Sequence, residues 1–144
     1  MLAGLTEISE IISSKTVNGE QQPCPGELYY RGYSIQELTD GFLSDGRFGF
    51  EETAYLLMFG QLPDAAQLEQ FNRQLAFYRS LPTNFVRDVI LKAPSPDMMN
   101  TLARCVLTMA SYDERPDDIS LPNVIRQCID MIAIFPLIAV YGYQ

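Results

Sequence analysis

Apolar residues spaced three and four positions apart recur through the last two thirds of the sequence, and glycine, proline and aspartate interrupt them. Residues 64–78 illustrate the pattern, because one side of their helical wheel is apolar while the other carries glutamine, glutamate and arginine. The apolar side consists of Leu68, Phe71, Leu75 and Tyr78. A three-to-four period predicts amphipathic helices, each of which needs a packing partner.

The interruptions give approximate ends to these helices. We expect them over 50–59, 64–78, 83–92, 98–112 and 123–141. The last helix contains Pro136, which should kink it, and is apolar nearly all round beyond Met131, so burial on more than one side is expected.

The first 49 residues have a different character. Asn18-Gly19 favours a type I′ hairpin turn, since both residue types tolerate positive φ. The segment Pro23-Cys24-Pro25-Gly26 should forbid regular strand pairing, so any sheet is expected to be small. Ser34 and Glu37 have the capping-box spacing and predict a short helix at 35–39, with a glycine-punctuated loop over 41–49.

The predicted fold class is therefore all-α, mainly helical, with a small β-hairpin-like region near the N-terminus. With 144 residues and 47% hydrophobic content, the chain is long enough for one domain, or one piece of a larger one. We divide it into an extended and hairpin region, 1–49, and a helical region, 50–144.

Charge and hydropathy argue against several partners. Ten basic and eighteen acidic residues give a net charge of −8, which would repel a nucleic-acid backbone. The longest apolar run, 131–140, has half the roughly 20 residues that a bilayer span needs, so we expect no membrane insertion. Three widely spaced cysteines suggest reduced thiols and a cytoplasmic protein, with Cys105 and Cys128 as small core residues.

The sequence contains no histidine, which removes the usual neutral-pH general base and the usual partner of a serine or cysteine nucleophile. Glycine-rich phosphate-binding motifs are absent as well.

Glu51 and Glu52 point about 100° apart on a helix, so they suit a helix N-terminus better than a catalytic pair. The acidic loop 113–118 is interpreted as a solvated loop rather than a metal site. The tyrosines and arginine of 29–33 form either a ligand platform or, as we favour, a packing cluster.

Several motifs occur in an order that resembles the citrate synthase family. The resemblance spans nearly the whole chain. It rests on Gly4-Leu5, the Tyr30-Arg31-Gly32-Tyr33 motif, the helix ending Phe59-Gly60-Gln61-Leu62-Pro63, the proline-bounded helix 83–92, and the long helix after Pro96. Family members commonly carry His-Pro-Met before that helix, whereas this chain has Ser95-Pro96-Asp97-Met98.

The resemblance implies that the chain is an amino-terminal segment of the large domain of an acyltransferase of the tricarboxylic acid cycle. The parent enzyme would condense acetyl-CoA with oxaloacetate, using two histidines and an aspartate with no counterpart in residues 1–144. We therefore assign no catalytic, cofactor-binding or metal residue to this chain, and no cofactor, since acetyl-CoA is a substrate. The segment alone should be inactive.

The resemblance also implies a homodimer, with helices 83–92 and 98–112 in the dimerising layer. Candidate interface residues, on the apolar sides of these helices, are Phe85, Val89, Leu102, Val106 and Met109. Two alternatives stay open: a 2-methylcitrate synthase segment, which would use propionyl-CoA, and a free-standing helical interaction module.

Overall fold

The structure, a computed structural model, describes residues 6–143, so Gly4-Leu5 of the resemblance lies outside the described residues. The chain divides after Phe71 into two compact units, and each unit is described by itself. The mainly helical class is confirmed, with one three-stranded sheet among the described residues.

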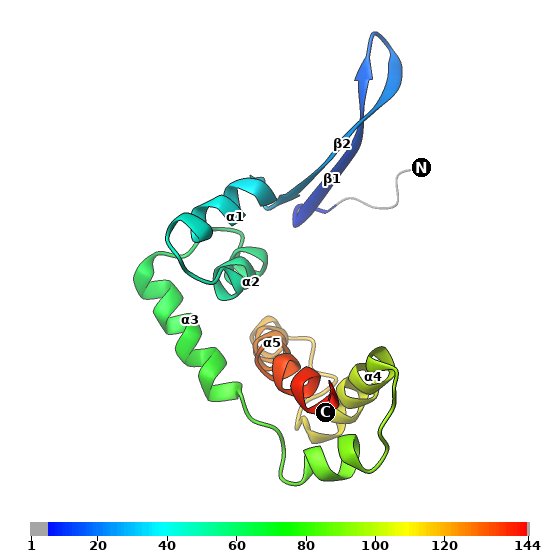
Figure 1. The fold of residues 1–144 in the computed structure, drawn as a ribbon. Helices are drawn as coiled ribbons and strands as arrows, with labels where there is room; N and C mark the ends of the chain where they lie inside the picture. The colour runs from blue at the N-terminus through cyan, green and yellow to red at the C-terminus, as the bar shows by residue number, and fades with distance from the viewer. Residues whose placement is uncertain (1–5, 144) are drawn as a thin grey trace. The chain divides into compact units, whose positions relative to one another are not determined.

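The elements run along the chain as coloured in Figure 1. The first unit contains β1 (Ser9–Val17), β2 (Glu20–Tyr30), β3 (Tyr33–Ser34), α1 (Ile35–Ser44) and α2 (Phe50–Phe59). The boundary falls within α3 (Ala65–Tyr78). The second unit contains the π-helix η1 (Val86–Leu91), α4 (Met98–Met109), the 3₁₀ turn η2 (Ala110–Tyr112) and α5 (Leu121–Tyr143).

The predicted hairpin turn is confirmed. Asn18 and Gly19 have φ of 54° and 86° and join β1 to β2, as a type I′ turn requires. The strands form a long antiparallel ribbon, which Figure 1 shows extending from α1.

The proline-containing segment disturbs the ribbon without ending it. Ile12 pairs with Glu27 and Ser14 pairs with Pro23, so one residue of β1 lies opposite three of β2, residues 24–26. The expected interruption of regular pairing is therefore seen at residues 24–26, while Pro23 pairs with Ser14 and regular pairing resumes from there toward the turn. A bulge absorbs the extra residues that have no ladder partner.

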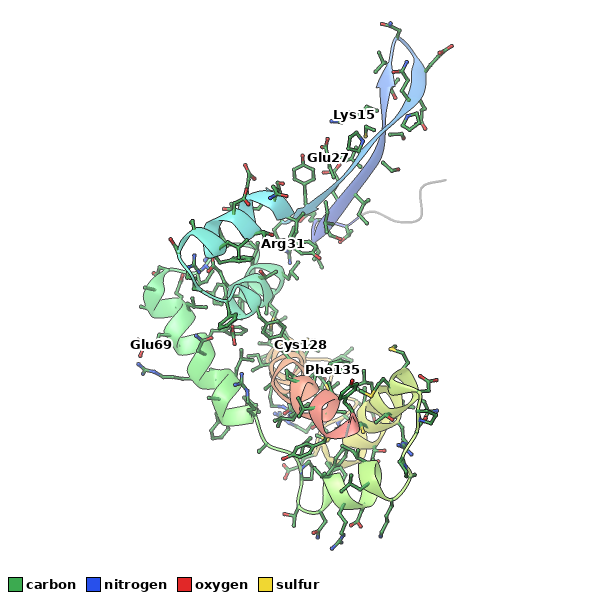
Figure 2. The ribbon with its side chains drawn as sticks, viewed as in Figure 1. Lys15, Glu27, Arg31, Glu69, Cys128 and Phe135 are labelled. Atoms are coloured by element: carbon green, nitrogen blue, oxygen red, sulfur yellow. The ribbon has the colours of Figure 1, made fainter. Side chains whose placement is uncertain are left out.

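An ion pair lies next to the bulge. Lys15 Nζ is 2.7 Å from Glu27 Oε1, and the Tyr29 hydroxyl donates to Glu27 Oε2 at 3.0 Å. Figure 2 shows Lys15 and Glu27 on the ribbon. The hydrogen bond from Lys15, followed by that from Tyr29, holds the pKa of Glu27 below its ordinary value.

Arg31 joins the sheet to α2. Arg31 and Gly32 form the tight turn between β2 and β3, with φ of 50° and 85°. The Arg31 guanidinium donates through Nε and Nη2 to the Leu57 carbonyl oxygen, at 3.3 and 2.9 Å. A cation at the last turn of a helix satisfies a carbonyl that has no partner within the helix.

The capping box at the start of α1 is confirmed. The Ser34 hydroxyl accepts from the Gln36 amide, and Glu37 Oε2 accepts from the Ser34 amide at 3.1 Å. The helix continues to Ser44, however, through half of the segment predicted as a glycine-punctuated loop. Gly41 lies inside it, where a single glycine weakens a helix without ending it.

An aromatic cluster holds α2 against the start of α3. The Tyr55 ring centroid lies 4.5 Å from that of Phe59 and 5.5 Å from that of Phe71. Gly60 ends α2 in the left-handed conformation, as predicted. Asp64 caps α3 by accepting from the Gln67 amide at 2.8 Å.

In the second unit, η1, α4 and α5 share one apolar core. Its buried members are Phe85, Ile90, Cys105, Ile134 and Ile138.

Asp97 caps α4 as predicted, and residues 110–112 tighten into the 3₁₀ turn η2. The predicted helix 83–92 is wrong in start and type, since a π-helix begins at Val86. Cys105 is buried as expected, but Cys128 is exposed.

Helix α5 is covered on only part of its surface. Ala133, Ile134 and Ile138 are buried, while Phe135 and Val140 are 41% and 62% exposed. Burial on more than one side is therefore not seen among the described residues. Length and composition would allow this helix to cross a bilayer, but the core helices of soluble proteins meet the same criteria.

The left-handed cap at Gly60 generates a prediction. Gly60→Ala should lower the free energy of unfolding by about 1 kcal/mol, because an L-residue is strained at φ of 81°. Gly41→Ala is the matched control, since the same added methyl meets no atom within 4 Å inside α1 and should stabilise the chain by up to ~1 kcal/mol. Urea unfolding measures the change in the free energy of unfolding of each variant. Changes of the same sign in both variants would contradict the prediction.

Candidate functional site

Four of the five candidate interface residues pack at the core of the second unit. Phe85 is 1% exposed and belongs to the core itself, and Val89, Leu102 and Met109 pack against that core half-buried. Val106 is half-buried and lines a hollow of about 270 Å³. Packing within the unit thus accounts for most of this apolar stripe, while its part in a dimer stays a prediction.

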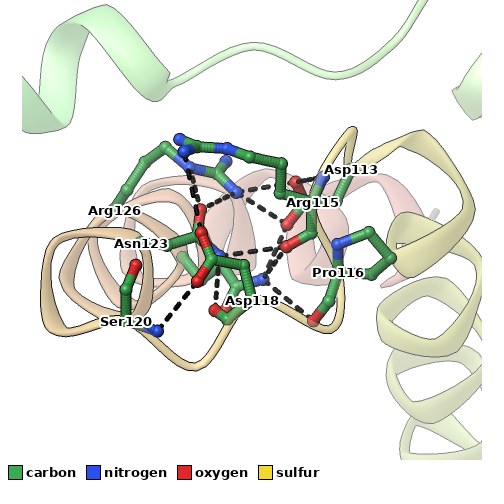
Figure 3. A network of polar contacts seen from close by, with 8 residues as sticks. Asp113, Arg115, Pro116, Asp118, Ser120, Asn123 and Arg126 are labelled. Carbon is green, nitrogen blue, oxygen red and sulfur yellow. Dashed lines mark hydrogen bonds and ion pairs between the residues drawn. The ribbon is translucent and has the colours of Figure 1, made fainter.

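The most extensive polar cluster joins the loop after η2 to the start of α5, as Figure 3 shows. At its centre is Asn123, which is 1% exposed. Its amide donates to the carbonyl oxygens of Arg115 at 3.0 Å and Asp118 at 2.8 Å, and its oxygen accepts from Arg126 Nε at 3.0 Å. One buried side chain therefore fixes two points of the loop and one guanidinium.

The Asp113 carboxylate is a second centre of hydrogen bonding in this cluster. It accepts from the Arg115 amide at 3.0 Å, from Arg126 Nη2 at 2.6 Å and from Gln127 Nε2 at 2.8 Å. These donors, led by the Arg115 amide, hold the pKa of Asp113 well below its usual range. The hydrogen bond from the Ser120 amide lowers the pKa of Asp118 as well. Residues 114–117 of the acidic loop are exposed, in agreement with the predicted solvated loop, while Asp113 and Asp118 at its two ends bind groups within the protein.

A hollow of about 450 Å³ lies beside this cluster. Leu81, Met109 and Tyr112 form an apolar part of its wall, and Arg126 and Asp130 a charged part. Burial raises the pKa of Asp130 above its ordinary value.

The chemistry open to this site is limited. The sequence has no histidine to act as base, and Arg126 Nη2 and Nε are engaged by Asp113 and Asn123. Among residues 6–143, no group of three or more cysteine, aspartate or glutamate side chains is placed to hold a metal ion. The arrangement fixes a loop and offers no nucleophile–base pair.

The other candidates from the sequence have structural contacts. Glu52 pairs with the Arg47 guanidinium, Arg31 binds the Leu57 carbonyl, and the Tyr29 hydroxyl donates to Glu27. These contacts favour the packing interpretation of residues 29–33.

Sequence reasoning missed two features. The role of Asn123 was missed because its amide group binds two backbone carbonyls, which no side-chain pattern reveals, although the Asn123–Arg126 spacing of three on a helix was a signal for the contact with the guanidinium. The second is a groove on α4 beside Arg104, whose Nε and Nη2 are shielded from water without a hydrogen-bond partner.

A family model described as "Citrate synthase, C-terminal domain" matches residues 1–144, the whole chain. The chain belongs to the citrate synthase family. Its place within the large domain of a citrate synthase, at the amino-terminal end, stays a prediction.

Curated citrate synthase relatives match at about 30% identity. 2-Methylcitrate synthase 1 of Corynebacterium glutamicum is 31% identical over 109 residues, which are 76% of this chain and 27% of that protein. Citrate synthase 1 of Mycobacterium tuberculosis strain H37Rv is 30% identical over 120 residues, or 83% of this chain and 26% of that protein. The chain thus spans about a quarter of the length of these relatives.

Solved citrate synthases share the fold. The enzyme from Pyrobaculum aerophilum matches 99% of this chain and 34% of its own, with a TM-score of 0.75 and 27% identity. The enzyme from Thermoplasma acidophilum, solved as a ternary complex with carboxymethyl coenzyme A and oxaloacetate, matches 99% of this chain and 33% of its own, with a TM-score of 0.77. At 20% identity the second likeness concerns the fold alone.

Asn123→Ala should lower the free energy of unfolding by about 2 kcal/mol, because the hydrogen bonds of a buried side chain to two backbone carbonyls and a guanidinium are lost. Asn72→Ala, at an exposed position of α3, is the matched control and should change stability by less than about 0.5 kcal/mol. Urea unfolding gives both values, and a loss at Asn123 no larger than at Asn72 would contradict the prediction.

Asp113 should make stability depend on pH. Since folding lowers its pKa, the ionised carboxylate stabilises the fold above the unfolded-state pKa of about 4, and this contribution is lost as the pH falls toward the folded-state pKa. Asp113→Asn should reduce stability at pH 7 and flatten the pH dependence below pH 4. Unfolding curves between pH 2 and pH 7 test this, with Asp117→Asn on the same loop as the control. An unchanged slope in Asp113→Asn would refute the assignment.

Proposed function

We propose that this chain is the amino-terminal, scaffolding segment of a cytoplasmic enzyme that condenses acetyl-CoA with oxaloacetate to give citrate and CoA. The observation that carries the proposal is the family match over all 144 residues. The Thermoplasma acidophilum relative binds a CoA analogue together with oxaloacetate, and we extend this substrate pair to the parent protein.

The catalytic groups belong to the rest of the parent enzyme in this proposal. The family resemblance implies that an aspartate removes an α-proton of acetyl-CoA while histidines assist enol formation and attack on the oxaloacetate carbonyl. Residues 1–144 include no histidine, so both histidines would lie in the rest of the parent enzyme, and the resemblance gives the aspartate no counterpart in this chain. Its contribution is structural: an apolar core around Phe85 and an internally bound loop at Asn123.

A second candidate is supported by the relatives themselves. Three 2-methylcitrate synthases match at 30–31% identity, similar to the citrate synthases at 26–34%. That activity would use propionyl-CoA in the same type of condensation. The two functions differ in the acyl group alone.

The parent protein is also proposed to act as a homodimer and without a cofactor. The alternative of a free-standing helical interaction module is less favoured, since α5 leaves Phe135 and Val140 uncovered. Such exposed apolar side chains suit a segment that packs against further protein.

A CoA-release assay separates these functions. The protein produced from the complete reading frame should release CoA thiol from acetyl-CoA in the presence of oxaloacetate, whereas residues 1–144 alone should give no rate above the enzyme-free blank. A kcat/KM at least tenfold higher with propionyl-CoA would assign the second function instead. Turnover by residues 1–144 would refute the scaffolding role, and no turnover of either acyl-CoA by the complete protein would refute the condensation.

A further inference from the structure

Another hollow of the second unit, of about 500 Å³, is lined by η1, by residues 79–82 and by Leu137 and Tyr141 of α5. Its volume is within the range of sites that bind small molecules. Most of the lining is apolar, and the apolar residues are Leu81, Pro82, Phe85, Val86, Leu91 and Leu137. The hollow is therefore suited to a ligand with an apolar body.

Two guanidinium groups, those of Arg79 and Arg87, give this hollow a positive charge. None of the described residues that line it is acidic, although the chain has a net charge of −8. Among the described residues, the Arg79 side chain has no hydrogen-bond or ion-pair partner. Arg87 Nε and Nη2 donate to Asp88 at 2.9 and 2.8 Å, and Asp88 also pairs with Lys92. Three cations thus share one carboxylate, and the donors of Arg79 remain for an oxyanion.

The backbone along one wall of the hollow is unusual in two ways. Asn84 has a φ of 64°, a left-handed conformation that is uncommon for residues other than glycine. The residues that follow form η1, the one π-helix of the described residues, where the Lys92 amide donates to the Arg87 carbonyl at 3.1 Å. Left-handed residues and π-helical turns carry a cost in stability and are frequent at functional sites. Their position at a positively charged hollow favours a binding role for it.

We propose that this hollow binds an amphipathic anion, a small molecule with a carboxylate or phosphate head and an aliphatic body. The Arg79 guanidinium, a planar fork of donors, binds two oxygens of the head, and Arg87 Nη1 supplies a further donor. The aliphatic body lies along Leu81 and Leu137, where its burial stabilises the complex. The charge selects an anion, and the apolar wall excludes a fully hydrated one.

Isothermal titration calorimetry of the complete protein with octanoate and with octyl phosphate tests the site. At least one of the two should bind, with one molecule per chain, and the tighter of the two identifies the head as a carboxylate or a phosphate. Octylammonium has the same tail with the opposite charge and should bind at least tenfold more weakly. Lengthening the tail from butyl to octyl should raise the affinity by up to about fourfold for each methylene, because each one buries apolar surface.

Substitution of the two arginines tests the place of binding. Arg79→Gln should raise Kd at least fivefold, because a bidentate, charge-assisted contact is lost. Arg79→Lys keeps the charge without the fork and should raise Kd less than Arg79→Gln does. Arg87→Gln should raise Kd at least twofold. Lys92→Gln is the matched control, since Lys92 is exposed and does not line the hollow, and it should change Kd less than twofold at about 0.15 M salt.

Two results with the wild-type protein would overturn the proposal. The first is the absence of binding by both octanoate and octyl phosphate, and the second is equal affinity for octylammonium. Among the variants, an unchanged Kd in Arg79→Gln and Arg87→Gln, or equal weakening in Arg79→Gln and Lys92→Gln, would do the same. Circular dichroism shows whether each variant is folded, and a misfolded Arg79→Gln leaves Arg87→Gln and the wild-type ligand series to decide.

This site does not rest on the proposed function, since the chain contributes no catalytic group to the condensation. CoA release by the same samples separates the two proposals. A complete protein that releases CoA but binds neither probe would refute the site alone. One that binds octanoate or octyl phosphate through Arg79 but turns over no acyl-CoA would refute the condensation alone.

Discussion

Burial of the apolar sides of α4 and α5 against one another is the interaction on which the second unit depends. Ile134 and Ile138 of α5 reach Cys105 of α4 and Phe85 before η1, and all four are at most 1% exposed. Each fully buried aliphatic or aromatic side chain contributes roughly 1.5–3 kcal/mol relative to its exposed form. The polar cluster around Asn123 lies at the start of α5, where the buried Asn123 side chain fixes the loop between the two packed helices through the carbonyls of Arg115 and Asp118.

Much of this fold is predictable from sequence because its signals are local. The turn at Asn18-Gly19, the capping box at Ser34 and the left-handed Gly60 each depend on residues a few positions apart. Two errors have different sources. A single glycine at 41 weakens α1 without ending it, so glycine alone does not locate a loop. Cys128 is exposed although its helix is apolar, because only part of the surface of α5 is covered.

The candidate site was harder to anticipate for the same reason. An apolar stripe in a sequence predicts that one face of a helix is buried but does not identify the partner that buries it. For Phe85 and Leu102 the partner is mainly the core of this chain's own second unit. Arg104 shows the converse, because a lone arginine on a helical wheel gives no sign that its donors will be shielded and unpaired. The family resemblance assigned the chain to the citrate synthases. The structure was needed to distinguish the side chains that pack inside the second unit from those that face solvent.

The bulge in the hairpin has a consequence for solubility. A long two-stranded ribbon presents free backbone donors and acceptors along its edges, which can recruit strands from other molecules into fibrils. Here the strand β2 carries two prolines without amide hydrogens, and its three unpaired residues interrupt the regular edge. Lys15 adds a charge on the neighbouring strand. The irregularity that looks like a defect in pairing thus protects the ribbon from intermolecular strand addition.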